Sequence, residues 1–241
     1  MASDISEIGD GFTVAMVMGP ITQSRKIRGK AEDFVKTWKH PGGKMLSDAK
    51  KPFKRLKKWE EEYTKLNDSL ISEMIKSGVA KRYTSENYSK INDFERLDRN
   101  SSEFHDNFPT KEMVAEYEKV NTTLSSQIKK SHLHKSITVA RGLKSDLYGN
   151  LSQGDVIREP GFTSTSLSES QARNFARKGG CMVYIDLPAG SNALYLEFDT
   201  VKPEQYELLL DRGSKFRYIG YGEMPDGMKY YHMELENNNE S

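Results

Sequence analysis

Apolar residues in the first half of the chain recur at three- and four-residue steps from Lys51 onward. This spacing places them on one face of a long amphipathic helix. Pro52 suits the first turn, where its missing N–H has no partner, and Gly78 suits the end, because glycine adopts the left-handed conformation freely. The residues expected on the buried face are Leu56, Trp59, Tyr63, Leu66, Leu70 and Met74.

Two further helices are predicted before residue 130. One covers roughly Ser85–Arg96, and the next begins after Pro109. The later helix also carries apolar side chains on one side at helical spacing, which indicates that it packs against a core. Those side chains are Met113, Tyr117, Val120 and Leu124.

The second half of the chain changes to short runs that are typical of β-strands. Pro225-Asp226-Gly227 separates the last two runs and predicts a hairpin. Helices followed by antiparallel strands indicate an α+β fold. The length suits a single domain over 1–241, with a mainly helical part at 1–130 and a β-rich core at 131–241. The predicted strands are Ile137–Ala140, Cys181–Leu187, Tyr206–Leu210, Phe216–Tyr221 and Met228–Leu235.

Composition argues against nucleic-acid and membrane proteins. The formal net charge is +1, so no global field recruits nucleic acid. The basic run at 50–58 is interpreted as a solvated helix face, because Lys58 stands four residues before Glu62 and can pair with it. The apolar stretch Phe12–Met18 is too short to span a bilayer. No membrane span is therefore expected.

The cysteine and histidine content predicts neither a disulfide nor a metal site. Cys181 is the sole cysteine and falls in a predicted strand, where it is interpreted as a small buried hydrophobe. His132 and His134 have no Cys or carboxylate cluster nearby, so they are assigned structural or surface roles. The chain also lacks the glycine fingerprints of phosphate loops and doubly wound nucleotide folds.

Three short segments combine residue types that serve phosphate and sugar chemistry. An arginine ends the predicted strand in Ile137–Gly142, a Ser/Thr run fills Gly161–Leu167, and Gln205-Tyr206-Glu207 leads into an apolar run. Each segment alone is a weak signal. A Ser/Thr run before a helix is commonly a cap, and Ser168–Gln171 does look like a helix start.

In this order and spacing the segments resemble the arginine, Ser-Thr-Ser and Gln/Glu-x-Glu motifs of clostridial-toxin-like mono-ADP-ribosyltransferases. That family includes Rho-modifying exoenzymes and the catalytic components of actin-modifying binary toxins. Upstream, Tyr83-Thr84 followed by Ile91-Asn92 and Leu97 looks like the family's tyrosine-bearing helix and Ile-Asn turn, and Phe175-Ala176 is similar to its phosphate–nicotinamide loop. The resemblance covers roughly residues 50–235. It implies two packed, mostly antiparallel β-sheets with an N-terminal helical layer, and NAD+ as co-substrate without a metal.

The resemblance also implies a role for each site residue. Glu207 would be the carboxylate that stabilises an oxocarbenium-like transition state, with Ser164 holding it by a hydrogen bond. Arg141 would grip the diphosphate bidentately, and Gly142 would let the backbone approach the nicotinamide amide. The other expected NAD+ contacts are Thr165, Phe175 stacked on the nicotinamide, Arg177 or Lys178 on a phosphate, and Tyr83 and Tyr88 on the far side of the pocket.

Position 205 bears on the acceptor. In the resembled family a glutamate there accompanies arginine acceptors, whereas a glutamine accompanies asparagine acceptors on Rho-like small GTPases or, in some relatives, guanine bases. Gln205 therefore favours an amide-type acceptor, because an amide hydrogen-bonds another amide but is a poor base. An arginine-specific enzyme acting on a protein such as actin stays open, because Glu204 adjoins Gln205 and could supply a second carboxylate. Lys202 stands where Rho-modifying enzymes carry an exposed aromatic, and target recognition is expected at 199–204.

Three other functions are alternatives. They are an NAD glycohydrolase with water as acceptor, a nucleic-acid ADP-ribosyltransferase, and a binding module that has lost catalysis. The joint presence of Arg141, Ser164 and Glu207 argues against the last of these. The resemblance implies a toxin or effector that is secreted or delivered by a bacterium or phage. It would act on a host protein in the target-cell cytoplasm and rely on a separate delivery component.

Overall fold

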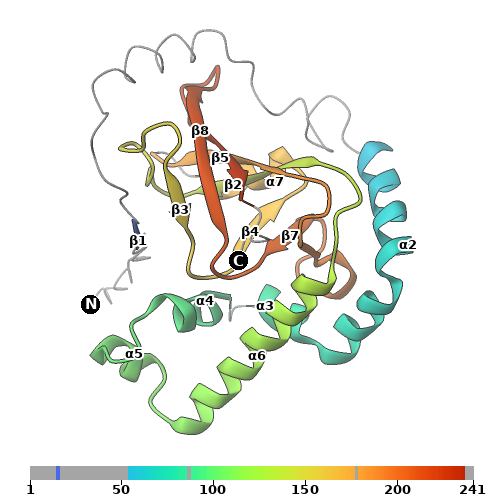
Figure 1. Cartoon of the computed structure of the whole chain (residues 1–241), viewed down its shortest axis with the longest axis vertical. Coiled ribbons are helices and arrows are strands. Elements are labelled where there is room, and N and C mark those ends of the chain that lie inside the picture. The colour runs from blue at the N-terminus through green and yellow to red at the C-terminus, as the bar shows by residue number, and fades with distance from the viewer. Residues whose placement is uncertain (1–14, 17–53, 86–87, 177–178, 237–241) are drawn as a thin grey trace, which may run out of the picture.

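The computed structural model describes residues 15–16, 54–85, 88–176 and 179–236. Helices fill the first half of the chain and strands the second, and Figure 1 shows α3 to α6 below the strands and α2 along one side. The helices are α2 (Lys54–Ser77), α3 (Val79–Thr84), α4 (Tyr88–Arg96), α5 (Ser102–Asn107), α6 (Lys111–Lys130) and α7 (Glu169–Phe175), with a 3-10 turn η2 (Glu197–Asp199). The strands are β1 (Ala15–Met16), β2 (Ile137–Leu143), β3 (Val156–Arg158), β4 (Thr163–Ser166), β5 (Cys181–Leu187), β6 (Leu194–Tyr195), β7 (Glu207–Leu210), β8 (Lys215–Glu223) and β9 (Lys229–Leu235).

The long helix α2 ends where the sequence predicts, at Gly78, which has a φ of 64°. The prediction is wrong for Leu66, which is 64% exposed. With 3.6 residues per turn, the buried stripe passes from Tyr63 to position 67 instead. Asn67 is buried there with a non-helical φ of −121°, and its side-chain amide donates to the carbonyl of Tyr63 at 3.0 Å. The other predicted core residues of α2 are buried: Leu56, Trp59, Tyr63, Leu70 and Met74.

The predicted helix over Ser85–Arg96 is shorter in the structure, and a separate helix precedes it. Helix α3 ends at Thr84, Ser85 is extended, and α4 begins at Tyr88. A helix of six residues, such as α3 or α5, gives fewer than two turns of periodicity, so the apolar pattern does not reveal it. The strands β3, β4 and β6, with two to four residues each, were missed for the same reason.

Hydrogen bonds join the described strands into one continuous sheet, in the order β1-β3-β8-β9-β5-β2-β4-β7-β6. Within it only β5 and β9 pair in parallel. Strands β2 and β4 are joined by the single pair Ala140↔Ser166, whereas β2 and β5 pair over seven residues. The two sheets implied by the resemblance are thus two parts of one continuous sheet, and they meet at the single β2–β4 pair, which we call the seam. Their apolar faces share a core, which includes Val139 and Val183 from one part and Leu208 from the other.

A second core fixes the helical layer to β6, to β7 and to Phe162, the residue before β4. Phe94, Phe108 and Tyr117 pack their rings together, with centroids 5.1 Å apart for the Phe94–Phe108 and Phe108–Tyr117 pairs. Phe162 and Leu209 join this cluster from the β-rich part. Because the cluster holds α3 and α4 against β4, the polar ends of those elements face each other across a cavity.

Two matched substitutions on α2 test the corrected helix face. Leu70→Ala removes a side chain that is 5% exposed, so we expect the free energy of unfolding to fall by about 2–5 kcal/mol. Leu66→Ala trims a side chain that is 64% exposed, and we expect a change within about 0.5 kcal/mol. Urea unfolding followed by circular dichroism measures both. Equal losses for the two variants would contradict the assignment of the buried face.

Candidate functional site

A cavity of about 290 Å³ lies between helices α3 and α4 and the strands β2, β4 and β7. The sequence-predicted residues come from segments far apart in the chain, and the fold brings them to this one place. Arg177 and Lys178 lie outside the described residues. The predicted residues that line the cavity are Tyr83, Tyr88, Arg141, Gly142, Ser164, Thr165, Phe175, Gln205 and Glu207.

Glu207 opens strand β7 and stands opposite Ser166 on β4. Ser164 is its diagonal neighbour on the same face, and it hydrogen-bonds the Glu207 carboxylate. Burial raises the pKa of Glu207 to about 7, and the nearby charge of Glu197 also raises it. The Ser164 hydrogen bond and the charges of Lys202 and Arg141 act in the opposite direction. The carboxylate therefore titrates near neutral pH.

A chain of hydrogen bonds supports Ser164 from behind. The Asn92 side-chain amide donates to the Tyr83 hydroxyl at 3.1 Å, and that hydroxyl lies 2.9 Å from the Ser164 Oγ. Since Tyr83 accepts from Asn92, its own proton is directed to Ser164, and the Ser164 proton is left for Glu207. Burial raises the pKa of Tyr83 to about 12, so the phenol stays neutral. Tyr83 is 1% exposed and acts mainly as a support for Ser164.

One face of α4 supplies three side chains to the cavity. Tyr88, Asn92 and Arg96 follow one another at four-residue steps and all line it. The predicted Ile-Asn turn is wrong, because Ile91 and Asn92 lie inside α4. No role was predicted for the side chains of Asn92 and Arg96, although their i+4 and i+8 spacing from Tyr88 was a usable signal. The awkward five-residue step from Tyr83 to Tyr88 has a simple cause, because the two tyrosines lie on different helices.

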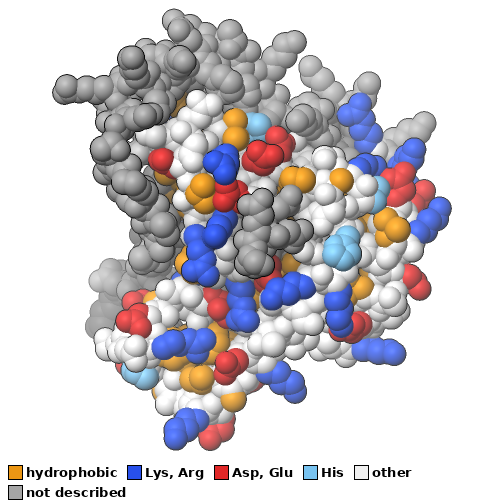
Figure 2. Space-filling model, viewed as in Figure 1, with side chains coloured by type: hydrophobic (Ala, Val, Ile, Leu, Met, Phe, Trp, Pro, Cys, Tyr) orange, Lys and Arg blue, Asp and Glu red, His pale blue; other side chains and the backbone are white. Residues whose placement is uncertain are grey.

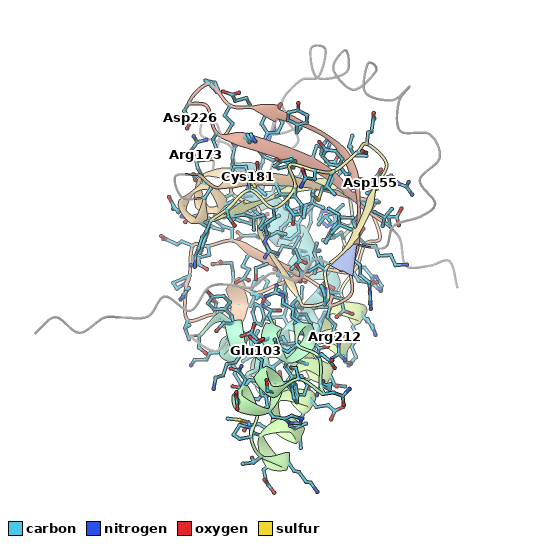
Figure 3. The ribbon with its side chains drawn as sticks, turned by 90° about the vertical axis from the view of Figure 1, so that its left-hand side faces the viewer. Glu103, Asp155, Arg173, Cys181, Arg212 and Asp226 are labelled. Atoms are coloured by element: carbon cyan, nitrogen blue, oxygen red, sulfur yellow. The ribbon has the colours of Figure 1, made fainter. Side chains whose placement is uncertain are left out.

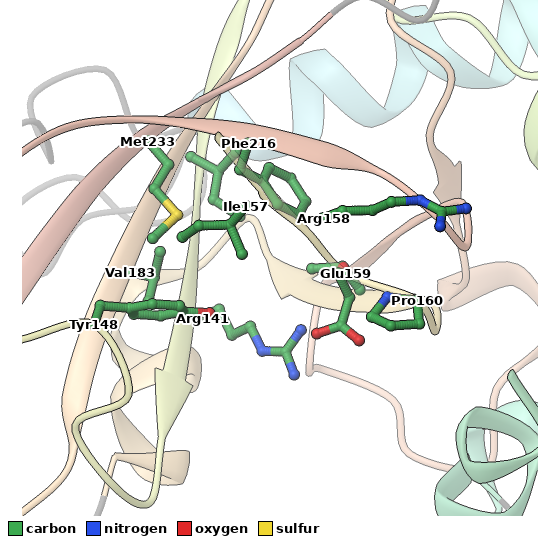
Figure 4. A pocket seen from close by; sticks show the side chains of 11 residues that line it. Arg141, Tyr148, Ile157, Arg158, Glu159, Pro160, Val183, Phe216 and Met233 are labelled. Carbon is green, nitrogen blue, oxygen red and sulfur yellow. The ribbon is translucent and has the colours of Figure 1, made fainter. Parts of the chain in front are cut away.

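The cavity wall is rich in positive charge. Arg96, Arg141, Lys144 and Lys202 line it, and Figure 2 shows Lys and Arg side chains gathered across the middle of one face of the molecule. The Arg96 Nε lies 3.0 Å from a Glu159 carboxylate oxygen. Arg141 and Glu159 extend toward each other beside a small cavity of about 20 Å³ (Figure 4). Glu159 thus holds one cavity arginine and faces the other.

Gly142 is required by packing as well as by any ligand. A Cβ at this position would lie 2.0 Å from the carbonyl oxygen of Ala172 and 2.7 Å from the backbone nitrogen of Ala176. The end of α7 therefore rests directly on β2, and this contact places Phe175, which is 51% exposed, at the cavity. The same helix is held on its other side by an ion pair between Arg173 and Asp226 in the β8–β9 turn (Figure 3).

The turn before β7 presents Gln205 to the cavity. Its two flanking residues, Glu204 and Tyr206, have φ angles of 67° and 51°. The described lining includes Lys202, Gln205 and Glu207 but not Glu204, which is exposed. The Gln205 carbonyl accepts a hydrogen bond from Ser166 Oγ at 2.7 Å, a contact that the sequence reasoning missed.

The remaining candidates from the sequence have structural contacts. The Thr165 hydroxyl donates to the Leu208 carbonyl at 2.6 Å and so ties β4 to β7. Cys181 is buried, and His134 lies 2.7 Å from the Glu62 carboxylate. The described residues contain no group of three His, Cys, Asp or Glu placed to hold a metal. Among the described helices, none is long and apolar enough to cross a membrane.

Comparison with known proteins agrees with this geometry. The family model described as ADP-ribosyltransferase exoenzyme matches residues 56–239. The structure is similar to Plx2a, an ADP-ribosyltransferase toxin from Paenibacillus larvae, with 22% identity, a TM-score of 0.59, and 76% of this chain and 94% of that chain covered. It is also similar to the Vis toxin from Vibrio splendidus (18% identity, TM-score 0.56, 83% and 93% covered). The C3stau2 structure from S. aureus with NAD gives 18% identity, a TM-score of 0.56, and 80% and 97% covered.

No curated protein sequence matches the chain at a significant level. At these identities the structural likeness shows the fold, and it confirms the predicted α+β ADP-ribosyltransferase architecture. The family model spans most of the chain and confirms the resemblance found in the sequence. The chain therefore belongs to the ADP-ribosyltransferase exoenzyme family and is an NAD+-dependent mono-ADP-ribosyltransferase of the toxin class.

Proposed function

We propose that this enzyme breaks the nicotinamide–ribose bond of NAD+ and transfers ADP-ribose to a side-chain amide of a host protein, with Glu207 as the catalytic carboxylate. The observation that carries the proposal is the position of Glu207. Its carboxylate lines a cavity with four cationic side chains, accepts a hydrogen bond from Ser164, and has a pKa near neutrality.

The chemistry requires the ionised form of that carboxylate. When the bond between ribose C1′ and the nicotinamide nitrogen breaks, nicotinamide leaves with the electron pair and positive charge spreads over the ribose ring. A fixed negative charge beside the ribose stabilises this transition state more than it stabilises the ground state. The acceptor nitrogen then forms a bond to C1′, and its proton passes to water. Ser164 keeps Glu207 aimed at the ribose throughout.

The cations and aromatics suit the remaining parts of NAD+. Arg141 and Arg96 supply two guanidinium groups for the two phosphates, and guanidinium matches phosphate oxygens bidentately. Phe175 and Tyr88, which are 51% and 48% exposed, offer free ring surface for stacking on the flat nicotinamide and adenine groups. Tyr83 has no such free surface, so we assign it to the support of Ser164 rather than to contact with NAD+.

The acceptor is inferred from the turn before β7. Gln205 lines the cavity two residues before Glu207, and its neutral amide pairs with another amide without acting as a base. Glu204 is exposed and does not belong to the cavity lining, which weakens the case for an arginine acceptor. We therefore favour an asparagine-type acceptor, on a small GTPase or a protein of similar surface. The loop at 199–204, which is exposed over residues 201–204, would meet that target inside the host cell, after delivery from the bacterium by a separate route.

Replacement of Glu207 by glutamine tests the catalytic assignment. We expect Glu207→Gln to lower nicotinamide release from NAD+ and ADP-ribose transfer by about 10²-fold or more, because it removes one transition-state charge contact. Chromatography of nicotinamide and label transfer from NAD+ to a host-cell lysate measure the two rates.

Glu204→Gln is the matched control for that variant. It makes the same chemical change three residues away on an exposed side chain, so we expect both rates to stay within about twofold of the unsubstituted enzyme. Unchanged rates for Glu207→Gln would refute the catalytic role. A large loss for Glu204→Gln would instead identify Glu204 as the second carboxylate of an arginine-specific enzyme.

The pH dependence of kcat/KM for NAD+ tests the state of the carboxylate. Because the ionised form is required and the pKa of Glu207 is raised to about 7, kcat/KM should be flat above pH 7 and fall about tenfold per pH unit below it. Ser164→Ala removes a hydrogen bond to the ionised form, so its acid limb should move to higher pH. A profile that is flat on both sides of pH 7, or a limb unmoved in Ser164→Ala, would contradict this account.

Neutral hydroxylamine separates the acceptor classes. We expect protein label formed from labelled NAD+ in a host-cell lysate to resist hydroxylamine, since an asparagine N-glycosidic linkage is stable to it. Label released by hydroxylamine would mean an arginine acceptor. Nicotinamide release without any protein label would point to a glycohydrolase or to a nucleic-acid acceptor, and label on added DNA or RNA would decide between these two.

A further inference from the structure

The turn before the catalytic strand has an unusual backbone. Glu204 and Tyr206 both have positive φ, at 67° and 51°, a conformation that L-residues other than glycine rarely adopt. Gln205 lies between them and Glu207 follows directly. The conformation of this turn therefore fixes where both side chains point, although neither strained residue lines the cavity itself.

One side chain binds the backbone of the whole turn. The Glu197 carboxylate accepts from the backbone N–H of Glu204 at 2.8 Å through Oε2 and from that of Tyr206 at 2.5 Å through Oε1. The backbone N–H of Glu207 also donates to it. The carboxylate of one residue in η2 thus accepts hydrogen bonds from three backbone N–H groups of the turn. Charge-assisted bonds of this kind are stronger than neutral ones.

The carbonyls of the turn have separate partners on β4 and its end. The Gln205 carbonyl accepts from Ser166 Oγ at 2.7 Å, and the Tyr206 carbonyl accepts from the Leu167 N–H at 3.0 Å. Both are neutral contacts on one side of the turn. Glu197 acts from the opposite side, through the N–H groups. On that side the Glu207 carbonyl also accepts from the Leu196 N–H at 3.0 Å, so removal of the Glu197 carboxylate leaves the Glu204 and Tyr206 N–H groups without their acceptor while this backbone bond remains.

We propose that Glu197 is a positioning residue that holds the 204–207 turn in its left-handed conformation and thereby aims Gln205 and Glu207 into the cavity. This inference rests on the proposed catalytic role of Glu207. Glu197 itself touches no cavity surface in the described lining, so it acts through the backbone and not through NAD+.

The charge of Glu197 has a second effect on the same site. It raises the pKa of Glu207, while burial raises the pKa of Glu197 itself and the backbone N–H groups lower it. The ionisable groups that face Glu197 are Glu60 from α2, Tyr195 from β6, and Tyr206 and Glu207 from the turn. Neutralising Glu197 therefore favours the ionised form of Glu207 while it loosens the turn.

Glu197→Gln tests the proposal by steady-state kinetics of nicotinamide release. Glutamine keeps one acceptor oxygen but places an NH₂ group against a backbone N–H, which breaks the double hold. We expect kcat to fall on the order of tenfold to a hundredfold, because Glu207 loses its aim, with KM for NAD+ changed less than about threefold. The acid limb of kcat/KM should move to lower pH. In that background, Glu204→Gly should restore kcat several-fold, because glycine adopts positive φ without strain.

Asp199→Asn is the matched control. It neutralises an acidic residue of the same 3-10 turn, whose carboxylate accepts from the Lys81 N–H and not from the 204–207 turn. We expect its kcat and acid limb to match those of the unsubstituted enzyme. A loss of kcat equal in both variants, without rescue by Glu204→Gly, would mean that η2 has only a general structural role and would overturn the proposal.

Hydrogen exchange of the backbone amides measures the stability of the 204–207 turn without depending on catalysis. In Glu197→Gln the amides of Glu204 and Tyr206 should exchange about tenfold faster or more, and in Asp199→Asn they should not. If the unsubstituted enzyme releases no nicotinamide, the proposed function fails while this measurement still decides the role of Glu197. Unchanged exchange in Glu197→Gln would overturn the inference even where catalysis is intact.

Discussion

The carboxylate of Glu207 lies in surroundings that raise its pKa to about 7, so its ionised form costs about 3 kcal/mol more than it would in water. The proposed chemistry nevertheless needs that ionised form in one orientation. Several polar groups around the cavity either lower or raise the cost of ionising Glu207. Ser164 favours the charged state by a direct hydrogen bond, and Arg141 and Lys202 favour it through their charge. The charge of Glu197 disfavours the ionised form of Glu207, while its carboxylate binds the backbone N–H groups of the turn.

The same requirement explains why the helical layer packs where it does. Tyr83 reaches Ser164 because α3 packs in one core with Phe162, which precedes β4, and with Leu209 of β7. Asn92 completes the link by donating to the Tyr83 hydroxyl and accepting from the Phe162 N–H at 2.8 Å, so one side chain joins α4 both to α3 and to the residue before β4. The helices therefore do more than cover the sheet, because they support the hydrogen bond that Ser164 makes to Glu207, the proposed catalytic carboxylate.

Much of this arrangement could be predicted from the sequence where the signal is local. The apolar stripe of α2, the end at Gly78 and the hairpin at Pro225-Asp226-Gly227 depend on neighbouring residues, and the structure has them. Leu66 was misplaced because a kink at Asn67 shifts the buried face by one position. The short elements α3, α5, β3, β4 and β6 left no periodic signal, whereas the four-residue strand β7 was predicted from its apolar run.

In the candidate site, too, residues in local sequence motifs could be predicted, and residues that depend on distant contacts could not. Arg141, Ser164 and Glu207 stand in short contiguous motifs, so their meeting in one cavity could be expected from a family resemblance. Glu197 had no motif of its own. Its hydrogen-bond partners are seven to ten residues later in the chain. The contacts depend on the left-handed conformation of Glu204 and Tyr206, which no sequence pattern predicts. Arg96 depends on Glu159, 63 residues away, and only the fold reveals that contact.

The single pair that joins the two parts of the continuous sheet has a consequence for tolerance to sequence change. Ala140 precedes Arg141, and Ser166 stands opposite both Ala140 and Glu207, so the seam passes directly between the cationic and the carboxylate halves of the site. The separation of these two groups is set at the seam and not by the outer strands. The outer strands can accordingly vary in length and composition without re-aiming the site.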